Sequence, residues 1–299
     1  MIISFWNTGI IHSNDRTSQE LQVLQVIYSI FTDENTDILF LCEIDDDFIT
    51  QISQSHEIFD SVNLIPATEK FSRNLCFGIC ALYKKHISLD LIKYNIFNDL
   101  DDGRQNTGTN IKVGVEFSVS SSENNPDLSI IVSHWSSKKT PGYEFKHKDA
   151  AEELRRECTQ LLEYGKQVIL IGDYNKTPEE IIRDTNLKSY NNKFYVLRDS
   201  KRLYNLSFSF NGQHSLLNNN MSGIVNQNGF GTFVSRSSRA SENGCAVLDH
   251  AHVSSAFLNE GPWLLKEGST KIIYNDLLKQ FIYGKDTLID HLPISLEVY

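Results

Sequence analysis

The sequence lacks the long apolar runs and the paired cysteines that mark membrane proteins and disulfide-rich proteins. No stretch approaches the ~20 consecutive apolar residues that a membrane-spanning helix requires, and the N-terminus has no basic segment typical of a secretory signal peptide. The five cysteines are odd in number and irregularly placed, which favours buried reduced thiols over a disulfide framework or a zinc site. We therefore expect a cytoplasmic protein.

Positive charge is also scarce, because 28 lysines and arginines face 38 aspartates and glutamates and leave a net charge of -10. This balance argues against a protein that coats nucleic acid, since such binding depends on lysine and arginine displacing counterions. It does not exclude a nuclease, because a metal-dependent active site is itself acidic. The basic stretch over residues 188–202 is either a phosphate-binding surface or a solvated one. Candidate substrate-binding residues are Lys138, Lys139 and Arg202.

Apolar periodicity predicts interleaved helices and strands. One helix should begin at Thr17, whose spacing to Glu20 is that of a capping box, and another should cover residues 146–164. The apolar residues at helical spacing in the first helix are Leu21, Leu24, Tyr28 and Phe31. Strands are expected over residues 2–7, 37–43, 77–83, 111–118, 128–134, 167–175, 246–254 and 293–298.

This order of elements predicts an α/β fold, a four-layer α/β/β/α sandwich in which two packed mixed sheets are flanked by helices. No internal repeat and no Pro-rich or Ser-rich linker divides the chain, so we expect a single domain over residues 1–299. The stretch over residues 211–231 holds six asparagines and four glycines. It should form a long surface loop, either a mobile tip or a substrate-facing arm.

Polar side chains that bind metals or move protons stand at the ends of the apolar runs. Asn7 ends the first run, in "FWNTG", where an asparagine is commonly a turn former. The same position in later runs is also polar, which favours a shared function over separate turns. The residues at these ends are Asn7, Glu43, His134, Asp173, Asn175, Asp249, Asp290 and His291. Because strand tips from two sheets can converge at one end of a sandwich, we expect these side chains to gather there.

The residue types in this group indicate metal-assisted phosphoester chemistry. Carboxylate and asparagine oxygens form a hard ligand set, which suits Mg²⁺ or Mn²⁺ and not zinc. Magnesium usually takes a few carboxylates together with phosphate oxygens, so the substrate should be a phosphate ester. The histidines would help to activate water or would donate to phosphate oxygens.

The ordered motifs "FWNTG", "LCEI", "SHWSS", "IGDYN", "LDHAHVS" and "DHLPI" resemble the endonuclease/exonuclease/phosphatase superfamily of deoxyribonuclease I-like phosphodiesterases. The resemblance spans residues 2–298, and "GDxN" and the terminal "DHxP" are its most specific parts. It implies one catalytic domain that hydrolyses phosphodiesters with Mg²⁺, or with Mn²⁺.

The resemblance also implies roles for individual residues. Asn7, Glu43 and Asp290 look like the metal ligands of the family. Asp173 and Asn175 resemble the pair that positions the nucleophilic water and the scissile phosphate.

The histidines follow the family pattern with some departures. His291 looks like the histidine at the phosphate, with Asp249 as the carboxylate that orients it. His134 matches the histidine of the deoxyribonuclease and sphingomyelinase branches, but the sequence does not identify its acidic partner. His250 and His252 stand where aromatic or aliphatic residues are commoner, and they are either buried or substrate-facing.

These features favour a nuclease that cleaves DNA first and RNA second. The alternative is an enzyme of the same fold that acts on a lipid headgroup or on an inositol or sugar phosphate. The third reading is a catalytically silent binding module, which is disfavoured because all the expected metal and histidine positions are present.

Overall fold

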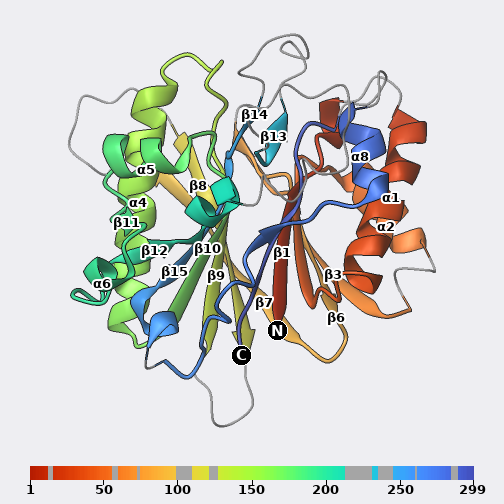
Figure 1. Ribbon diagram of the computed structural model, residues 1–299. Helices are drawn as coiled ribbons and strands as arrows, with labels where there is room; N and C mark the ends of the chain where they lie inside the picture. Colours follow the sequence, from red (N-terminus) through yellow and green to blue (C-terminus); the bar gives the residue numbers. More distant parts are fainter. Residues whose placement is uncertain are drawn as a thin grey trace.

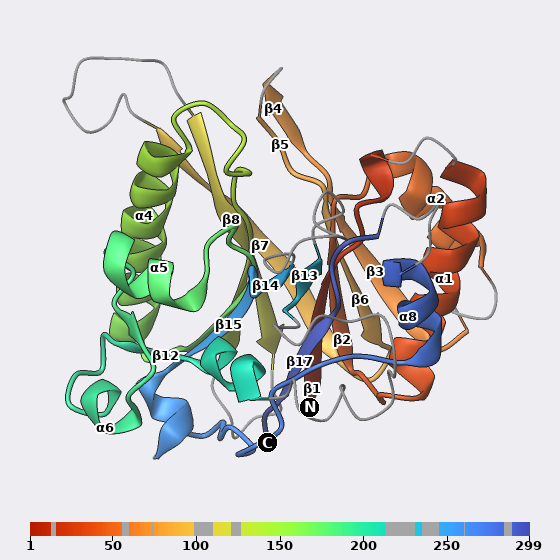
Figure 2. The ribbon, with the colours of Figure 1, turned by 45° about the horizontal axis from the view of Figure 1, so that its top comes forward.

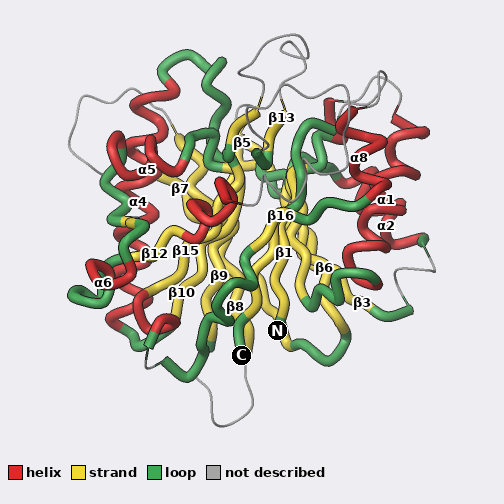
Figure 3. Tube along the Cα trace, in the orientation of Figure 1, coloured by secondary structure: helices red, strands yellow, loops and turns green. Residues whose placement is uncertain are grey.

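Two β-sheets pack face to face at the centre of the computed structural model, and helices cover the outer face of each sheet (Figure 1). The structure describes residues 1–12, 16–55, 60–72, 75–98, 110–120, 127–212, 231–234, 245–259, 261–283 and 289–299. Figure 3 shows the strands gathered between two groups of helices. The predicted α/β/β/α sandwich is therefore confirmed.

The first sheet has six strands and the second has seven. In spatial order, the first sheet contains β16 (Lys271–Ile272), β17 (Ile294–Glu297), β1 (Ile2–Asn7), β2 (Ile38–Cys42), β6 (Ile79–Lys84) and β3 (Val62–Ala67). The second contains β11 (Ser189–Tyr190), β12 (Leu203–Asn205), β15 (Asp249–Ser254), β10 (Gln167–Asp173), β9 (Leu128–His134), β8 (Asn110–Ser120) and β7 (Ser88–Asn98). Two small pairs join β4 (Lys70–Ser72) to β5 (Leu75–Cys76) and β13 (Phe233–Val234) to β14 (Cys245–Ala246).

The helices form the two outer layers, as Figures 1 and 2 both show. Those beside the first sheet are α1 (Arg16–Thr32), α2 (Asp46–Gln54) and α8 (Asp276–Tyr283). Those beside the second sheet are α4 (Tyr143–Glu163), α5 (Pro178–Asp184) and α6 (Lys193–Val196). Short 3-10 helices are η1 (Ile10–His12), η2 (Leu206–Gly212) and η4 (Ser255–Leu258).

Strand alternation divides the buried side chains of the second sheet between two cores. Successive side chains of a strand point to opposite faces. In β10, Ile169 and Ile171 belong to the core between the sheets, whereas Leu170 belongs to the core beneath the helices. The sheets themselves are joined by contacts such as that of Phe40 with Phe117, whose ring centroids lie 5.0 Å apart.

The polar ends of several strands meet at one edge of the sandwich. Strands β1 and β2 are parallel, as are β9 and β10, so the carboxyl ends of each pair lie together. Strand β15 runs antiparallel to β10 and begins at this edge, with Asp249 opposite Asp173. Because side chains alternate along a strand, Asp173 lies on the same face of β10 as Ile171, and Asp249 lies on the same face of β15 as Ala251. This is the inner face, between the sheets. The fold thus explains why strand-end residues distant in sequence gather.

The first helix differs from the sequence prediction. It begins at Arg16, so Thr17 lies inside its first turn instead of capping it. The predicted stripe is also wrong in part, because Leu21 is 61% exposed and Tyr28 is 44% exposed. Its buried apolar face consists of Val23, Val26, Ile27, Ile30 and Phe31. The chain does contain a capping box, at Thr177 and Glu180 in front of α5.

Other predictions have simpler outcomes. All eight predicted strands are present: β1 and β9 match the predicted ranges at both ends, and the other six differ at one or both ends. The long strand β7, the strand β3 and several short strands were not predicted. All five cysteines are free thiols, as expected, but only Cys42, Cys80 and Cys158 are buried, whereas Cys76 is exposed and Cys245 is partly buried. No helix in the described part of the chain is long and apolar enough to cross a membrane. Most of the predicted loop over residues 211–231 lies outside the described residues.

Candidate active site

A histidine–carboxylate pair occupies the inner edge of the sandwich. His291 Nδ1 lies 2.8 Å from Asp249 Oδ2, and both side chains are buried. Burial alone would lower the pKa of His291, but the charge of Asp249 and its hydrogen bond raise that pKa to about 10. His291 therefore carries a positive charge near neutral pH and can donate from both ring nitrogens.

Backbone contacts fix the two members of this pair. Trp6, from β1, donates its Nε1–H to the carbonyl oxygen of His291 at 3.0 Å. Thr232 Oγ1 accepts the backbone N–H groups of Leu248 and Asp249, each at 3.0 Å. The backbone N–H of Leu292 donates to the carbonyl oxygen of Thr232 at 2.6 Å, so Thr232 joins the turn before β17 to the start of β15. Thr232 was not predicted as a site residue, because it follows the Asn-rich stretch and lies in no apolar strand.

Asp173 lies beside this pair, at the end of β10. Its Oδ2 is 3.9 Å from His291 Nε2 and accepts Nδ2–H from Asn7 at 3.1 Å. Its Oδ1 accepts the backbone N–H of Asn175 at 2.8 Å. Burial raises the pKa of Asp173 to about 6, and nearby Asp249 adds to this effect while the charge of His291 opposes it.

Close backbone packing supports the end of β10. Gly172 has a φ of 154°, and a Cβ atom there would lie 2.0 Å from the carbonyl oxygen of Ser133 in β9. Only glycine fits this approach. Asn175 has a φ of 51° and donates from Nδ2 to the carbonyl oxygen of Trp135 at 3.0 Å. The "GDYN" motif therefore combines a packing residue with two site residues.

Asn7 both forms a turn and contacts the site. Its Oδ1 accepts the backbone N–H of Gly9 at 3.2 Å, and Gly9 has a φ of 63°. Its Nδ2 is the group that donates to Asp173. The turn-forming interpretation is therefore confirmed, and the nitrogen of the same amide contacts Asp173.

Glu43 lies between two histidines. Its Oε1 is 3.4 Å from His134 Nε2, and its Oε2 is 3.5 Å from His12 Nε2. Burial would raise its pKa, but the hydrogen bond and charge of His134 lower that pKa to about 2, so the carboxylate is ionised. Glu43 is therefore the acidic partner of His134 that the sequence did not identify. The sequence also gave no sign of His12, which follows the site on η1 and is 68% exposed in its side chain.

The donors at this edge suit a hard divalent cation. The hydroxyl of Thr8 donates to the carbonyl oxygen of Glu43 at 3.2 Å, which places the ionised Glu43 next to Asn7. Ligand atoms of Asp173, Asp249 and His291 all lie within 4.8 Å of one another, but Nδ1 of this histidine is already bonded to Asp249, and a hard cation prefers oxygen donors to an imidazole nitrogen. The oxygen-rich side of the site, at Glu43, is thus the better fit.

The remaining predicted ligand, Asp290, lies next to His291 in the chain. Its negative charge contributes to the raised pKa of His291. Its backbone carbonyl oxygen accepts the N–H of Val234 at 2.7 Å, which ties this turn to β13. All eight strand-end residues of the sequence prediction are therefore found at or beside the same edge.

The three candidate substrate-binding cations are less uniform. Lys138 follows β9, and its Nζ contacts both carboxylate oxygens of Glu180 in α5 at 2.8 and 2.7 Å. Lys139 is its exposed neighbour. Arg202 precedes β12, whose Leu203 pairs with Ser254 at the far end of β15. Within the described residues, Lys138 is thus engaged by a carboxylate of α5 and Arg202 lies toward the far end of β15.

His250 and His252 point away from the site. They are fully buried on the helix-facing side of β15, with ring centroids 5.3 and 5.2 Å from that of Tyr174. Burial lowers the pKa of His250 to about 4 and that of His252 well below its usual range. Of the two alternatives left open by the sequence, the buried one holds.

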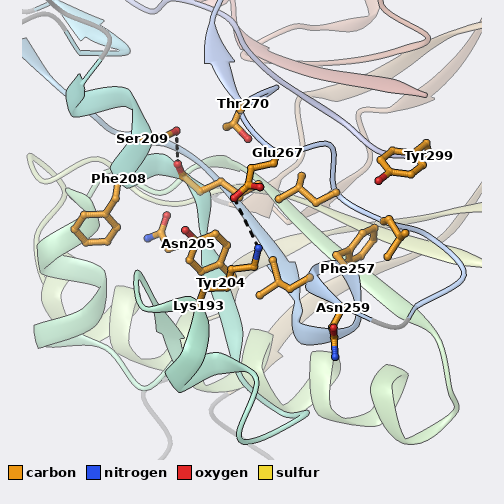
Figure 4. A pocket seen from close by; sticks show the side chains of 15 residues that line it. Lys193, Tyr204, Asn205, Phe208, Ser209, Phe257, Asn259, Glu267, Thr270 and Tyr299 are labelled. Atoms are coloured by element: carbon orange, nitrogen blue, oxygen red, sulfur yellow. Dashed lines mark hydrogen bonds and ion pairs between the residues drawn. The ribbon is translucent and has the colours of Figure 1, made fainter.

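A separate cavity of about 370 Å³ contains none of the predicted site residues (Figure 4). It lies where β12 and η2 approach η4 and the chain after it, and Tyr299 lines it. Its one lysine, Lys193, is 3.8 Å from the carboxylate of Glu267. This cavity is therefore not the predicted phosphoester site.

Comparisons with known proteins support the fold. No family model and no curated protein matches the chain. Truncated TDP2 from Caenorhabditis elegans matches with 15% identity and a TM-score of 0.58, covering 100% of this chain and 96% of that one. An endonuclease/exonuclease/phosphatase family protein from Bacteroides thetaiotaomicron matches with 14% identity and a TM-score of 0.57, covering 100% and 97%. The human Nocturnin catalytic domain with bound sulfate matches with 14% identity and a TM-score of 0.55, covering 100% and 94%.

The chain therefore has the fold of the endonuclease/exonuclease/phosphatase superfamily. The resemblance that the motifs predicted is confirmed at the level of the fold.

Proposed function

We propose that this protein is a Mg²⁺-dependent phosphodiesterase, and specifically a nuclease that cleaves DNA in preference to RNA. The observation that carries the proposal is the meeting of a charged His291–Asp249 pair with Asp173 at 3.9 Å, beside the ionised Glu43. This combination offers hydrogen-bond donors for phosphate oxygens next to oxygen ligands for a metal ion.

Each group has a distinct part in the proposed reaction. Asp173 and Asn175 position the attacking water for in-line displacement. His291 donates from Nε2 to the phosphate, while Asp249 fixes the ring by accepting from Nδ1. His134, held by Glu43, supports the non-bridging oxygens.

The metal would be held by Glu43, Asn7 and Asp290. When bound, Mg²⁺ stabilises the negative charge on the leaving oxygen and polarises the phosphoryl group. Mn²⁺ would serve in the same place, because it accepts the same oxygen donors. Lys138 and Lys139 would contact phosphates that flank the scissile one.

Several observations support a nucleic-acid substrate. The solved structures that share the fold include a protein described as an endonuclease/exonuclease/phosphatase, and Nocturnin was solved with a sulfate, a tetrahedral anion like phosphate. The preference for DNA over RNA rests on the resemblance to deoxyribonuclease-type motifs alone.

A substrate panel tests the proposal. Purified protein would be incubated with supercoiled DNA, single-stranded DNA, RNA, an inositol phosphate and a phospholipid, in Mg²⁺, Mn²⁺ or EDTA. We expect DNA cleavage that EDTA abolishes and that Asp173→Ala removes, while Glu163→Gln, a surface control, retains it. Release of product from the lipid or inositol phosphate alone would replace the nuclease by a headgroup enzyme. No hydrolysis of any substrate would contradict the proposal.

A further inference from the structure

A second cavity of about 530 Å³ lies on the helix-covered side of the second sheet. It is bordered by α4, by the end of α5 and by the edge strand β11, which lie side by side in Figure 1. The volume is in the range of small-molecule sites, roughly 300 to 1,000 Å³. None of the residues assigned to the phosphoester site lines this cavity.

Three cationic side chains line this cavity, and no carboxylate does so. Arg183 is bound by Asp184, which it contacts from Nε at 2.6 Å and from Nη2 at 2.8 Å. Arg155 and Lys188 have no ion pair with any described residue, and both side chains are partly buried. An unpaired charge that is partly removed from water is unfavourable, and a bound anion would offset this cost for both cations.

A polar atom without a partner supports this view. Arg155 Nε is buried and has no hydrogen-bond partner in the described part of the chain. Two acidic residues on the neighbouring helices are engaged by other partners. Glu152 accepts from Asn186 Nδ2 at 2.7 Å, and Asp184 is held by Arg183 and lies 3.6 Å from Lys176.

The edge strand adds to the cavity wall. Strand β11 pairs with β12 on one side only, so its other edge has no partner strand among the described residues. Lys188 stands directly before it with a φ of 57°, and Ser189 and Tyr190 complete that wall. A planar guanidinium and a compact ammonium together match a tetrahedral anion that carries more than one negative charge.

We propose that this cavity binds a phosphate group of a phosphorylated ligand, held between Arg155 and Lys188, at a site separate from the catalytic one. The cavity of Figure 4 differs in that its lysine is paired. Its lysine, Lys193, is already paired with Glu267, so that cavity offers an anion no free charge.

Calorimetric titration with inorganic pyrophosphate tests the proposal. The experiment uses the full chain in EDTA, so that no divalent cation recruits the anion to the catalytic site. The test variant is Arg155→Gln with Lys188→Asn, because glutamine suits a helix and asparagine tolerates a positive φ. The control is Lys193→Gln with Lys201→Gln, which also removes two positive charges, each of them paired with a glutamate.

We expect the wild type and the control to bind pyrophosphate, and the test variant to bind it roughly tenfold more weakly for each lost cation. Equal affinity in all three proteins, or no binding by the wild type, would overturn the proposal. If the double variant does not fold, Lys188→Asn alone carries the test, with the same two outcomes.

Competition separates the sources of the phosphate. Displacement of pyrophosphate by a mononucleotide would identify a small phosphorylated ligand. Displacement only by a 5′-phosphorylated DNA strand would identify a nucleic-acid phosphate. Either result supports the proposal, provided that the test variant no longer binds the displacing ligand.

Discussion

Strand β15 separates two groups of histidines that have opposite properties. At the inner edge, His291 contacts Asp249 and His134 contacts Glu43, so each histidine has a carboxylate. On the outer face, His252 Nδ1 contacts the hydroxyl of Ser189 at 2.6 Å, and His250 is packed against aromatic rings.

The contrast shows that environment and not residue type sets the role of each histidine. His291 has a pKa raised to about 10, whereas His250 has a pKa lowered to about 4. His250, which is buried beneath the helices, directly follows Asp249 in the chain. The alternation of the strand therefore divides a charged reaction site from a neutral structural cluster.

Among the carboxylate variants, Asp249→Asn should have the largest effect, because it removes the carboxylate that orients and charges His291. We expect kcat for DNA cleavage to fall by roughly 100-fold to 1,000-fold. Single-turnover rates at saturating substrate would measure this loss. Asp199→Asn, which changes a surface carboxylate at the other end of the sheet, is the control. An equal loss of kcat in both variants would show that Asp249 has no special role in cleavage.

Glu43→Gln should reduce the apparent affinity for Mg²⁺ by roughly 10-fold to 100-fold, since it removes an ionised ligand and the partner of His134. The measurement is the Mg²⁺ dependence of the cleavage rate. Glu163→Gln is the matched control on the surface. An unchanged Mg²⁺ midpoint would exclude Glu43 as a metal ligand.

His252→Gln should change how stability depends on pH and should leave the site intact. The folded state holds the pKa of His252 well below its usual value, so below about pH 6.5 the unfolded chain binds a proton that the folded chain does not. Stability is therefore lost as the pH falls. For one such group the loss between pH 7 and pH 5 is about 2 kcal/mol.

Urea unfolding of the wild type and of His252→Gln at both pH values measures this effect. We expect the decrease in the free energy of unfolding to be smaller in the variant. The raised pKa values of Asp173 and His291 have the opposite effect, because they make the folded state more stable as the pH falls. The effect of His252 is therefore the difference between the decreases measured for the two proteins. An identical decrease would show that His252 is protonated in the folded state.

The smallest effect should come from Arg202→Gln. Arg202 stacks on the ring of Tyr195 at 3.8 Å and contacts Asp199, far from Asp173 along the sheet. For a short oligonucleotide we expect KM to change less than twofold, whereas Lys138→Gln should raise it roughly threefold. A larger increase in KM for Arg202→Gln would show that the substrate also contacts the region around Arg202.

Much of the fold and the site could be predicted from the sequence. Apolar runs that end on polar residues located β1, β2, β9 and β10, and the motif order identified the fold. These signals are local, so they do not depend on knowing how the chain packs.

The unpredicted features depend on contacts between distant segments. Glu43 and His134 belong to different sheets, and no spacing in the sequence reports that they meet. The buried face of α1 was misjudged because Val23 and Ile27, not Leu21, turn toward the sheet, and several helical stripes fit that apolar stretch. The burial of His252 depends on the cover provided by Tyr174, which the sequence could not place.

The most direct test of the account exchanges one histidine from each group. Cleavage of a labelled DNA oligonucleotide in Mg²⁺ would be compared for the wild type, His291→Gln and His252→Gln, each confirmed as folded by circular dichroism. The account predicts a loss of roughly 1,000-fold in kcat for His291→Gln and a change of less than about threefold for His252→Gln. Retained activity in His291→Gln, or an equal loss in His252→Gln, would contradict it.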